Sequence, residues 1–216
     1  MHSVFAGIDV GERSLHVVVL GNRGEFVDQL HFAATELDRA VDAVLGAAAV
    51  AIDSPDRLSA AVHASDSELV IAPKFRMGRC AEIGLLKLHR YQVPWVTPVS
   101  DELLPGWMRV GIDLFARLRD AGQDPIEVFP DAGFRRLAGQ LKPLPKKGTR
   151  AGTLERVRLL GLTGVSAPGI AMWGPDWMDA ALSAQLARMS ASGDAVAATC
   201  GHDGTAIWIP ARPATR

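Results

Sequence analysis

The first 32 residues contain three strand-like segments joined by two short connections, and this pattern limits the possible folds more than any other feature of the sequence. Residues 3–10 are almost continuously apolar, residues 15–20 include three successive valines, and residues 25–32 form a third segment in which apolar and polar residues are mixed. Short apolar runs rich in β-branched residues are typical of strands. The connections at 11–13 and 21–24 are glycine-containing turns. We therefore expect the chain to open with a three-stranded antiparallel meander.

Strands and helices are expected to alternate after this meander. Apolar runs at 47–52, 125–129 and 206–209 predict strands. Helical periodicity predicts helices over six segments, 36–45, 78–91, 106–121, 131–139, 153–162 and 175–189. Residues 57–67 have no clear pattern, and residues 67–72 fit either a small strand or a loop.

This order of elements predicts the fold class. Three antiparallel strands, a helix, and then strands alternating with helices are the order of a ribonuclease H-like α/β fold. In that fold the meander is followed by parallel strands, and helices cover both faces of the mixed sheet. The sequence has no internal repeat and no domain boundary. We therefore expect residues 1–216 to form a single domain.

Charge and composition exclude several classes of protein. With 23 basic and 24 acidic residues, the net charge is −1, so no global field directs the protein to nucleic acid or to an anionic membrane. Residues 1–11 lack a basic segment and include Asp9, which is atypical of a signal peptide. The uncharged segment 159–175 contains glycines and prolines and would be a poor membrane span. We expect a cytoplasmic protein.

The cysteines and histidines give no metal motif in the sequence. Cys80 and Cys200 are too few for a disulfide framework or, alone, for a zinc cluster. We interpret them as small thiols of a protein from a reducing compartment. The six histidines show no metal-binding spacing, and His202 with Asp203 is interpreted as a glycine-flanked surface turn. The five tryptophans are interpreted as core or interface residues, with stacking on nucleic-acid bases as the alternative.

Four acidic residues lie where the local pattern favours an apolar or neutral residue. Asp9 is in the first predicted strand, Asp53 follows the run Ala-Val-Ala-Ile, and Glu127 lies inside a short apolar strand. Asp179 lies on the helix that starts near Pro175. Ligands of α/β sheets gather at the carboxyl ends of strands, and the glycines beside Asp9 leave room next to its carboxylate.

Asp179 is the most informative of the four by geometry. It shares one helical face with Leu182, Leu186 and Met189, so it continues an apolar stripe. A carboxylate that faces the interior must be hydrogen-bonded, paired or metal-bound. Asp176 lies near the same face, but it equally fits an acid stabilised by the helix dipole.

Each acid also has a purely structural interpretation. Asp53, before Ser-Pro, is of the type that caps a turn, and Asp179 fits a helix-start acid. Glu127 fits a partner of an arginine. Asp9, flanked by apolar residues, fits a structural role least well. A structural role for all four together is less favoured than for any one of them.

The four acids are candidate ligands of a divalent metal ion. Carboxylates that converge on one point repel each other unless a cation is present, and oxygen-rich clusters suit Mg²⁺ or Mn²⁺. Two such ions about 4 Å apart activate a water and stabilise the leaving oxygen of a phosphodiester. This chemistry needs acids on separate elements that a sheet and one helix hold rigidly.

A local basic segment accompanies these acids. Between residues 132 and 158 Glu155 is the only acid, and the basic residues are Arg135, Arg136, Lys142, Lys146, Lys147, Arg150, Arg156 and Arg158. We interpret Lys146, Lys147 and Arg150 as candidate phosphate contacts. The alternative is a solvated helix face with a flexible loop.

Six short motifs together resemble a known family. They are Gly7-Ile-Asp-Val-Gly11, Ala51-Ile-Asp-Ser-Pro55, Glu127-Val-Phe-Pro130, the Lys146-Lys147 to Arg150 segment, Asp176-x-x-Asp179-Ala180 and Gly204-Thr-Ala-Ile-Trp-Ile-Pro210. Over residues 4–210 the chain is similar to the bacterial and archaeal family called domain of unknown function 429. The resemblance implies a predicted nuclease with a ribonuclease H-like fold and no established substrate. It places Asp9, Asp53, Glu127 and Asp179 at positions expected for metal-binding acids.

One segment departs from the family pattern. The family often has Arg-x-Cys-Asp before a helix, whereas this chain has Arg79-Cys80-Ala81-Glu82. The corresponding acid is therefore either absent or replaced by Glu82.

The leading functional hypothesis is a divalent-metal-dependent phosphodiesterase, a nuclease. Asp9 would bridge two ions, Asp53 and Asp179 would hold one each, and Glu127 would complete a shell or act as a base. The substrate would be DNA, RNA or a small nucleotide. One alternative is a non-catalytic ribonuclease H-like binding or scaffold module. The other is an actin-like phosphotransfer relative, because 7–11 also resembles the first phosphate motif of actin-like ATPases and sugar kinases.

Overall fold

The predicted antiparallel meander is confirmed at the start of the chain. The computed structural model describes residues 3–214. Strands β1 (Val4–Val10), β2 (Ser14–Gly21) and β3 (Phe26–Ala33) pair in order, each antiparallel to the next. Gly24 has a positive φ of 88° in the β2–β3 turn, a conformation that only glycine adopts at low cost.

Four further strands complete a seven-stranded mixed sheet in the order β3-β2-β1-β4-β5-β7-β6. Strand β4 (Ala49–Asp53) is parallel to β1, β5 (Ile126–Val128) is parallel to β4, and β7 (Ile207–Pro210) is parallel to β5. Strand β6 (Ala195–Ala198) is antiparallel to β7. The predicted ribonuclease H-like fold class is confirmed by this strand order. Only β6 was not expected, because its Ala-Val-Ala-Ala sequence carries little strand propensity.

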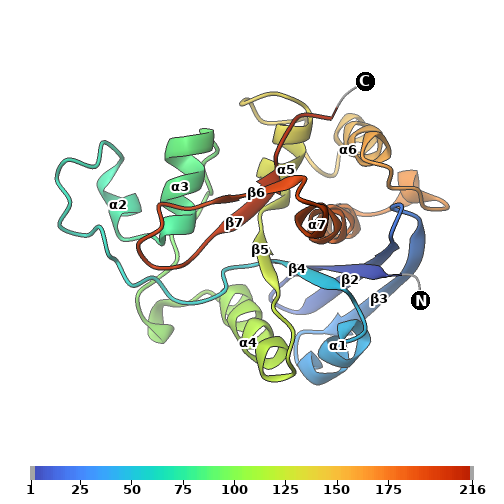
Figure 1. Cartoon of the computed structure of the whole chain (residues 1–216), viewed down its shortest axis with the longest axis horizontal. Coiled ribbons are helices and arrows are strands. Elements are labelled where there is room, and N and C mark those ends of the chain that lie inside the picture. The colour runs from blue at the N-terminus through green and yellow to red at the C-terminus, as the bar shows by residue number, and fades with distance from the viewer. Residues whose placement is uncertain (1–2, 215–216) are drawn as a thin grey trace.

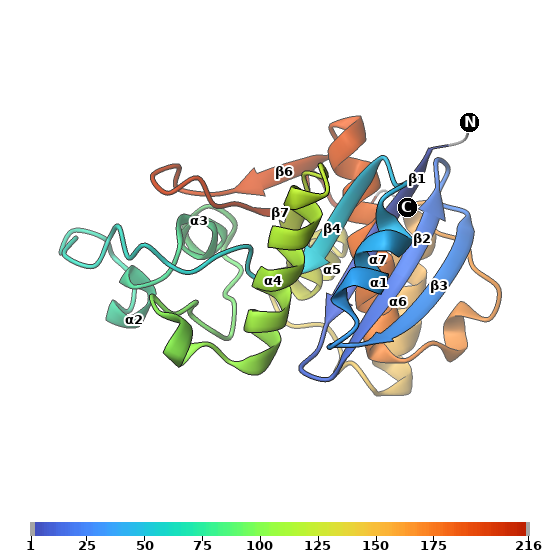
Figure 2. The same cartoon turned by 90° about the horizontal axis from the view of Figure 1, so that it is seen from below.

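Helices cover both faces of the sheet, as predicted (Figures 1 and 2). They are α1 (Leu37–Val44), α2 (Pro73–Arg76), α3 (Cys80–His89), α4 (Gly106–Asp120), α5 (Pro130–Leu137), α6 (Arg150–Leu162) and α7 (Pro175–Ser192), with 3-10 turns at Asp101–Leu103 and Ile170–Met172. Helices α1 and α4 lie on one face, and α5, α6 and α7 lie on the other. The unassigned residues 57–72 form turns and loops. No helix in the described part of the chain is long and apolar enough to cross a membrane.

Helix α7 packs directly on β1 because β1 carries a glycine at the crossing. A Cβ atom on Gly7 would lie 2.0 Å from the backbone nitrogen of Ala184 and 2.3 Å from the carbonyl oxygen of Ala180. No side chain fits there, so the helix backbone rests on the strand backbone. This contact fixes the depth at which the first turn of α7 meets the end of β1.

Two hydrophobic layers lie on the two faces of the sheet. On the α7 face the layer includes Phe5, Val18, Ala51 and Val128. On the opposite face it includes Ile8, Val17 and Ile52, packed with α1 and α4. The alternation of strand side chains therefore assigns each strand residue to one face.

The two cysteines are not separate thiols, and our expectation on this point is wrong. Cys80 and Cys200 form a disulfide with a Cα–Cα distance of 4.8 Å. The bond joins the first residue of α3 to the β6–β7 loop, where the backbone N–H of Cys200 also donates to the carbonyl of Cys80. Local sequence patterns do not reveal this pairing, because 120 residues separate the two positions.

Candidate functional site

Three of the four predicted acids come together at one edge of the sheet. Asp9 near the end of β1 lies opposite Asp53 at the end of β4 in the parallel register. Asp179, in the first turns of α7, completes the group, and carboxylate oxygens of all three lie within 4.8 Å of one another. Because β1 and β4 are parallel, their carboxyl ends share an edge, which is where such sheets bind ligands.

Strand alternation and the Gly7 contact explain this convergence. Asp9 and Asp53 point to the same face as Gly7 and Ala51, two residues earlier on each strand. Helix α7 lies on that face, and Asp179 is 2 % exposed under the strand ends. The apolar stripe predicted on α7 therefore does face the sheet, with Asp179 at its N-terminal end.

Burial raises the pKa of all three carboxyl groups. Desolvation is the largest cause for each of them. The pKa of Asp53 is held well above its ordinary value, because the charges of Asp9 and Asp179 add to the effect of burial. Burial likewise raises the pKa of Asp179 to about 6, although the ammonium group of Lys147 opposes the shift. These shifts report carboxylates that lack sufficient compensating positive charge.

Lys147 is the one predicted basic residue that contacts the acids. Its ammonium group forms an ion pair with Oδ2 of Asp179. Burial alone would lower the pKa of Lys147, but Asp179, Asp53 and Asp9 together raise it. The Lys147 side chain is 40 % exposed and therefore reaches the acids from solvent. Lys146 and Arg150 lie nearby in sequence with exposed side chains.

One oxygen of the acid group has no hydrogen-bond partner. Oδ1 of Asp179 is buried and unpaired, while Oδ2 accepts from Lys147. A buried carboxylate oxygen without a partner is costly, and a cation is one way to satisfy it. The donor set of three carboxylates, with that open oxygen, fits Mg²⁺ or Mn²⁺. Asp9, Asp53 and Asp179 are therefore the residues able to hold such an ion.

Two residues beside Asp9 escaped the sequence analysis or were discounted there. His16 lies opposite Asp9 in the β1–β2 register, with Nδ1 3.7 Å from Oδ2 of Asp9. Asp9, His16 and Asp176 form a second close group, whose ligand atoms lie within 4.8 Å of one another. The ring of Trp177 packs edge-on against His16 at 4.7 Å. The position of His16 was readable in principle, because it sits seven residues after Asp9 across a short hairpin.

Glu127 does not join the other three acids. Its neighbours Ile126 and Val128 pack on the α7 face, so Glu127 points to the opposite face, where its register partner is Ile52. There the guanidinium of Arg79 donates to both Glu127 oxygens at 2.6 Å. This contact matches the structural interpretation of Glu127 as a partner of an arginine. Burial raises the pKa of Glu127 to about 7, and Arg79 opposes that shift.

Arg79, whose side chain is fully buried, is the centre of an ionic group. It also donates to Oδ1 of Asp56 at 3.1 Å, and to Oε1 of Glu82 and the Thr97 hydroxyl. Glu82 in turn accepts the backbone N–H of Thr97 at 3.1 Å. Glu82, the acid in the segment that departs from the family pattern, therefore bonds to Arg79 and Thr97. These contacts lie on the opposite face of the sheet from Asp9.

An aromatic cavity adjoins the acid group. It has a volume of about 330 Å³, and its lining includes Asp53, Lys147, Trp95, Trp107 and Phe129. The two indole rings meet edge-on with centroids 5.1 Å apart, and Trp95 meets Phe129 in the same way at 5.0 Å. The cavity therefore combines apolar ring surfaces with two acids, Glu12 and Asp53, and one base, Lys147.

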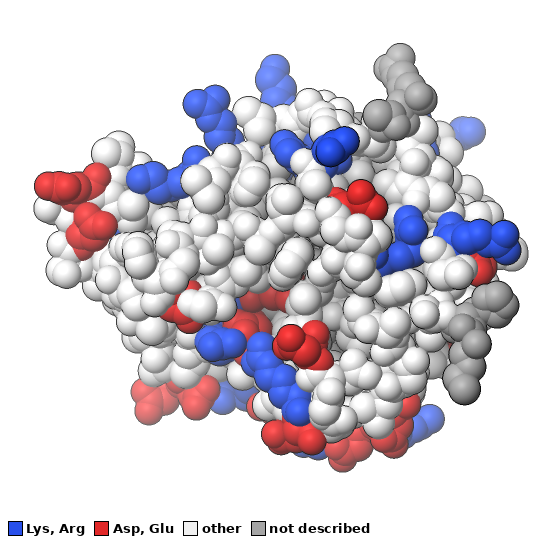
Figure 3. All heavy atoms as spheres, in the orientation of Figure 1, with Lys and Arg blue, Asp and Glu red and all other residues white. Residues whose placement is uncertain are grey.

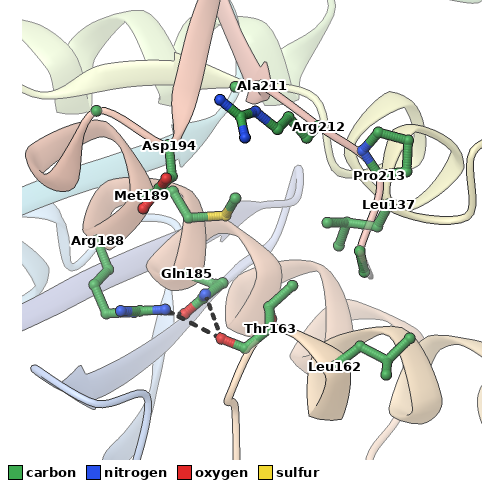
Figure 4. Close-up of a pocket in the computed structure, with 12 residues that line it drawn as sticks. Leu137, Leu162, Thr163, Gln185, Arg188, Met189, Asp194, Ala211, Arg212 and Pro213 are labelled. Atoms are coloured by element: carbon green, nitrogen blue, oxygen red, sulfur yellow. Dashed lines mark hydrogen bonds between the residues drawn. The ribbon is translucent and has the colours of Figure 1, made fainter. Parts of the chain in front are cut away.

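A larger cavity lies at the other end of α7 and offers less chemistry. Figure 4 shows this cavity, which has a volume of about 450 Å³ and is lined by residues of α7 and of the segment 211–214. Two of its polar residues are already paired, because Gln185 and Arg188 both donate to the carbonyl of Thr163. We therefore take the acid group, and not this cavity, as the candidate site.

The surface carries mixed charge. On the face seen in Figure 3, lysines and arginines are dispersed among neutral side chains and acidic groups, without a broad basic patch. This distribution agrees with the net charge of −1. Any contact with a polyanion on this face would have to be local.

Solved structures to which the chain is similar include two of RuvC. "T. thermophilus RuvC in complex with Holliday junction substrate" gives a TM-score of 0.40 at 16% identity, covering 96% of this chain and 100% of that chain. "Thermus thermophilus RuvC structure" gives 0.41 at 17% identity, covering 95% and 99%. A ROK family glucokinase from Streptomyces griseus in complex with glucose and AMPPNP gives 0.30 at 12% identity, covering 64% and 37%. The fold class rests on the strand order and strand directions.

The family comparison agrees with the motifs. No curated protein matches the chain. The family described as "Protein of unknown function (DUF429)" matches residues 98–203, just under half of the chain. This segment contains Glu127, Lys147 and Asp179, whereas Asp9 and Asp53 lie before it. The resemblance to domain of unknown function family 429 that the motifs predicted is confirmed.

Proposed function

We propose that this protein is a divalent-metal-dependent phosphodiesterase that cleaves nucleic acid. The observation that carries the proposal is the convergence of Asp9, Asp53 and Asp179 from three elements, with Oδ1 of Asp179 buried and unpaired. Three carboxylates beside a single lysine leave an excess of negative charge. That excess favours a bound cation over a purely structural role.

Asp9, Asp53 and Asp179 are the proposed ligands of Mg²⁺ or Mn²⁺. When bound, such an ion lowers the pKa of water and stabilises charge on phosphodiester oxygens. The chain supplies the rigidity that this requires, since two ligands lie on paired strands and the third lies on a helix seated on Gly7. Glu127 is outside this set because Arg79 occupies both of its oxygens.

Lys147 has two roles in the proposal. Without metal, its ammonium group partly neutralises Asp179. With metal bound to Asp179, that ammonium group becomes available to a substrate phosphate at the mouth of the site. Lys146 and Arg150, both exposed, extend the contact along the backbone of a nucleic acid.

The aromatic cavity supports a nucleotide substrate. Trp95 and Trp107 line a space that also contains Asp53 and Lys147. Aromatic side chains stack on nucleobases with little sequence preference. A nucleotide whose phosphate lies at the acids therefore has an apolar surface beside it for its base.

A cleavage assay tests the proposal. Labelled single-stranded, double-stranded and branched DNA and RNA are incubated with the protein and Mn²⁺, with chelator as the blank. We expect cleavage that Asp9→Asn and Asp179→Asn each reduce by about 100-fold or more. Asp42→Asn, an exposed acid on α1, is the matched control and should retain full activity.

Two outcomes would contradict the proposal. Cleavage that persists in Asp9→Asn would place the activity elsewhere or in a contaminant. Mn²⁺ binding that is the same in the amide variants and in the unmodified protein would favour a non-catalytic binding or scaffold module.

A further inference from the structure

A second group of metal-ligating side chains lies away from the acid site. It consists of Cys80 at the start of α3, Cys200 and His202 in the β6–β7 loop, and His63 in the long loop after β4. Their ligand atoms all lie within 4.8 Å of one another. Three segments that are far apart in the sequence thus bring two sulfurs and two imidazoles to one point.

The nitrogen atoms are spaced as a tetrahedral metal site requires. His63 Nε2 lies 3.0 Å from His202 Nδ1, 3.3 Å from Cys200 Sγ and 3.9 Å from Cys80 Sγ. Zn²⁺ bonds of about 2.3 Å to sulfur and about 2.0 Å to nitrogen give N–N separations of about 3.3 Å and N–S separations of about 3.6 Å. The two observed N–S distances bracket the expected N–S separation, and the observed N–N distance is slightly shorter than the expected one.

Outer contacts orient the ligands. The other ring nitrogen of His63, Nδ1, lies 3.4 Å from Oδ2 of Asp66, so Nε2 is the atom that faces the sulfurs. Carboxylates in this position are the usual second partners of metal-bound histidines. The backbone N–H of His202 donates to Cys80 Sγ at 3.3 Å, and Asp203 accepts the N–H of Cys80 at 2.9 Å. The β6–β7 loop is thereby folded around the start of α3.

An ion can reach this group from solvent. His202 is exposed, Cys80 is buried, and His63 and Cys200 lie between these extremes. A surface cavity of about 310 Å³ opens onto His63, Cys200 and His202, with Asp66 among its lining residues. The four ligands therefore lie at the base of a surface cavity that is open to solvent.

We propose that Cys80, Cys200, His63 and His202 form a redox-gated Zn²⁺ site. In the oxidised state the two sulfurs are joined to each other and do not bind metal. A dithiol reductant breaks the S–S bond by supplying two electrons and two protons, and is itself left as a disulfide. Zn²⁺ then binds two thiolates and two neutral imidazoles, and the two thiol protons pass to solvent.

Either state ties the start of α3 to the β6–β7 loop. Arg79, which holds Glu127 and Asp56, immediately precedes Cys80. A protein that is reduced and metal-free loses this tie. Zinc thus takes the place of the disulfide as the crosslink under reducing conditions.

Cobalt and zinc binding to the full-length chain test this inference. The protein is reduced with a phosphine, freed of reductant under anaerobic conditions, and titrated with Co²⁺, whose sulfur-to-metal charge-transfer band reports thiolate ligation specifically. Zn²⁺ affinity is then measured by competition with a chromophoric chelator. We expect one sulfur-ligated ion per reduced chain, displaced by Zn²⁺, and no such band in the oxidised protein.

Variants assign the ligands. Cys200→Ser should abolish the charge-transfer band, and His202→Asn, at an exposed position that leaves the fold intact, should weaken Zn²⁺ binding by about tenfold or more. His89→Asn, on the same helix as Cys80 but outside the group, should bind Zn²⁺ as the unmodified protein does. Absence of a sulfur band in the reduced protein would overturn the inference. Equal Zn²⁺ affinity of His202→Asn and the unmodified protein would also overturn it.

Discussion

Two groups of buried carboxylates lie on opposite faces of the same sheet, and they differ in their positive charge. On one face Glu127, Glu82 and Asp56 surround Arg79, whose side chain is fully buried. On the other face Asp9, Asp53 and Asp179 share Lys147, which is partly exposed and contacts only Asp179 directly. The first group contains its own cation, and the second leaves a buried oxygen unpaired.

This difference separates a structural role from a functional one. A guanidinium that donates to several carboxylates satisfies them permanently and ties α3, β5 and the loop after β4 together. Carboxylates that remain short of positive charge make the fold less stable and the site more able to bind a cation. The same residue type, at neighbouring strand ends, thus serves two purposes according to the face it points to.

Removing Arg79 should have the largest effect on stability. Arg79→Met leaves Glu127 and Glu82 buried without their shared cation, so we expect a loss of about 3–5 kcal/mol in the free energy of unfolding. Asp56 keeps its ion pairs with Arg57 and Arg119. Urea denaturation measures it. Asp9→Asn, which removes a charge from the other group, should be neutral or stabilising without metal. Similar losses in the two variants would refute the distinction between the groups.

Adding a side chain at the contact between β1 and α7 should have the second-largest effect on stability. In Gly7→Ala the new Cβ collides with the α7 backbone at Ala184 and Ala180, so we expect a loss of about 3 kcal/mol. Because α7 carries Asp179, metal affinity should fall as well. Gly161→Ala is the matched control, since its Cβ meets nothing within 4 Å and should stabilise α6 by up to about 1 kcal/mol. A Gly7→Ala protein as stable as the control would show that the close contact does not position the helix.

The acid group should make the metal-free protein less stable as pH rises. Burial raises the pKa of Asp179 to about 6 from 3.8, so between these values the folded state binds a proton that the unfolded chain has released. Stability therefore falls as pH rises through about 4 to 6, by an amount on the order of 3 kcal/mol. Asp179→Asn should flatten this part of the profile, measured by urea denaturation in chelator. If the stability difference between the two proteins stays constant over this pH range, the raised pKa of buried Asp179 is contradicted.

Replacing Lys147 should have the smallest effect of these substitutions. It should raise the affinity for Mn²⁺, whereas Gly7→Ala should lower it. Lys147→Met removes the ammonium group that competes for Asp179, so we expect Mn²⁺ to bind several-fold more tightly while cleavage becomes weaker. Lys146→Met, at an exposed position with no carboxylate contact, should leave Mn²⁺ affinity unchanged. Equal metal affinities of the two variants would show that Lys147 and the metal do not share Asp179.

The sequence predicted the fold and much of the acid group because both follow from periodicity. The meander and the stripe on α7 are local patterns, and Asp9 and Asp53 stand out as polar residues at the ends of apolar strands. Alternation in the short strand β5, however, puts Glu127 on the opposite face from Asp53. That face was readable from Ile126 and Val128, but their own orientation depends on the tertiary contacts of α7.

The remaining features depend on contacts distant in sequence. Arg79 pairs with Glu127, which lies 48 residues further along the chain. Cys80 pairs with Cys200, which lies 120 residues further along. His63 and His202 show no spacing typical of a metal site because they belong to separate loops. Strand β6 has an alanine-rich sequence and is stabilised by its pairing with β7. Local pattern carries no information about such partners.

Calorimetric titration of Mn²⁺ into the oxidised protein tests the contrast between the two carboxylate groups most directly. Asp9→Asn alters the group that is short of positive charge, and Asp56→Asn alters the group around Arg79. We expect Mn²⁺ to bind the unmodified protein and Asp56→Asn with similar affinity, and we expect Asp9→Asn to lose Mn²⁺ binding. No binding to the unmodified protein, or undiminished binding to Asp9→Asn, would contradict this contrast.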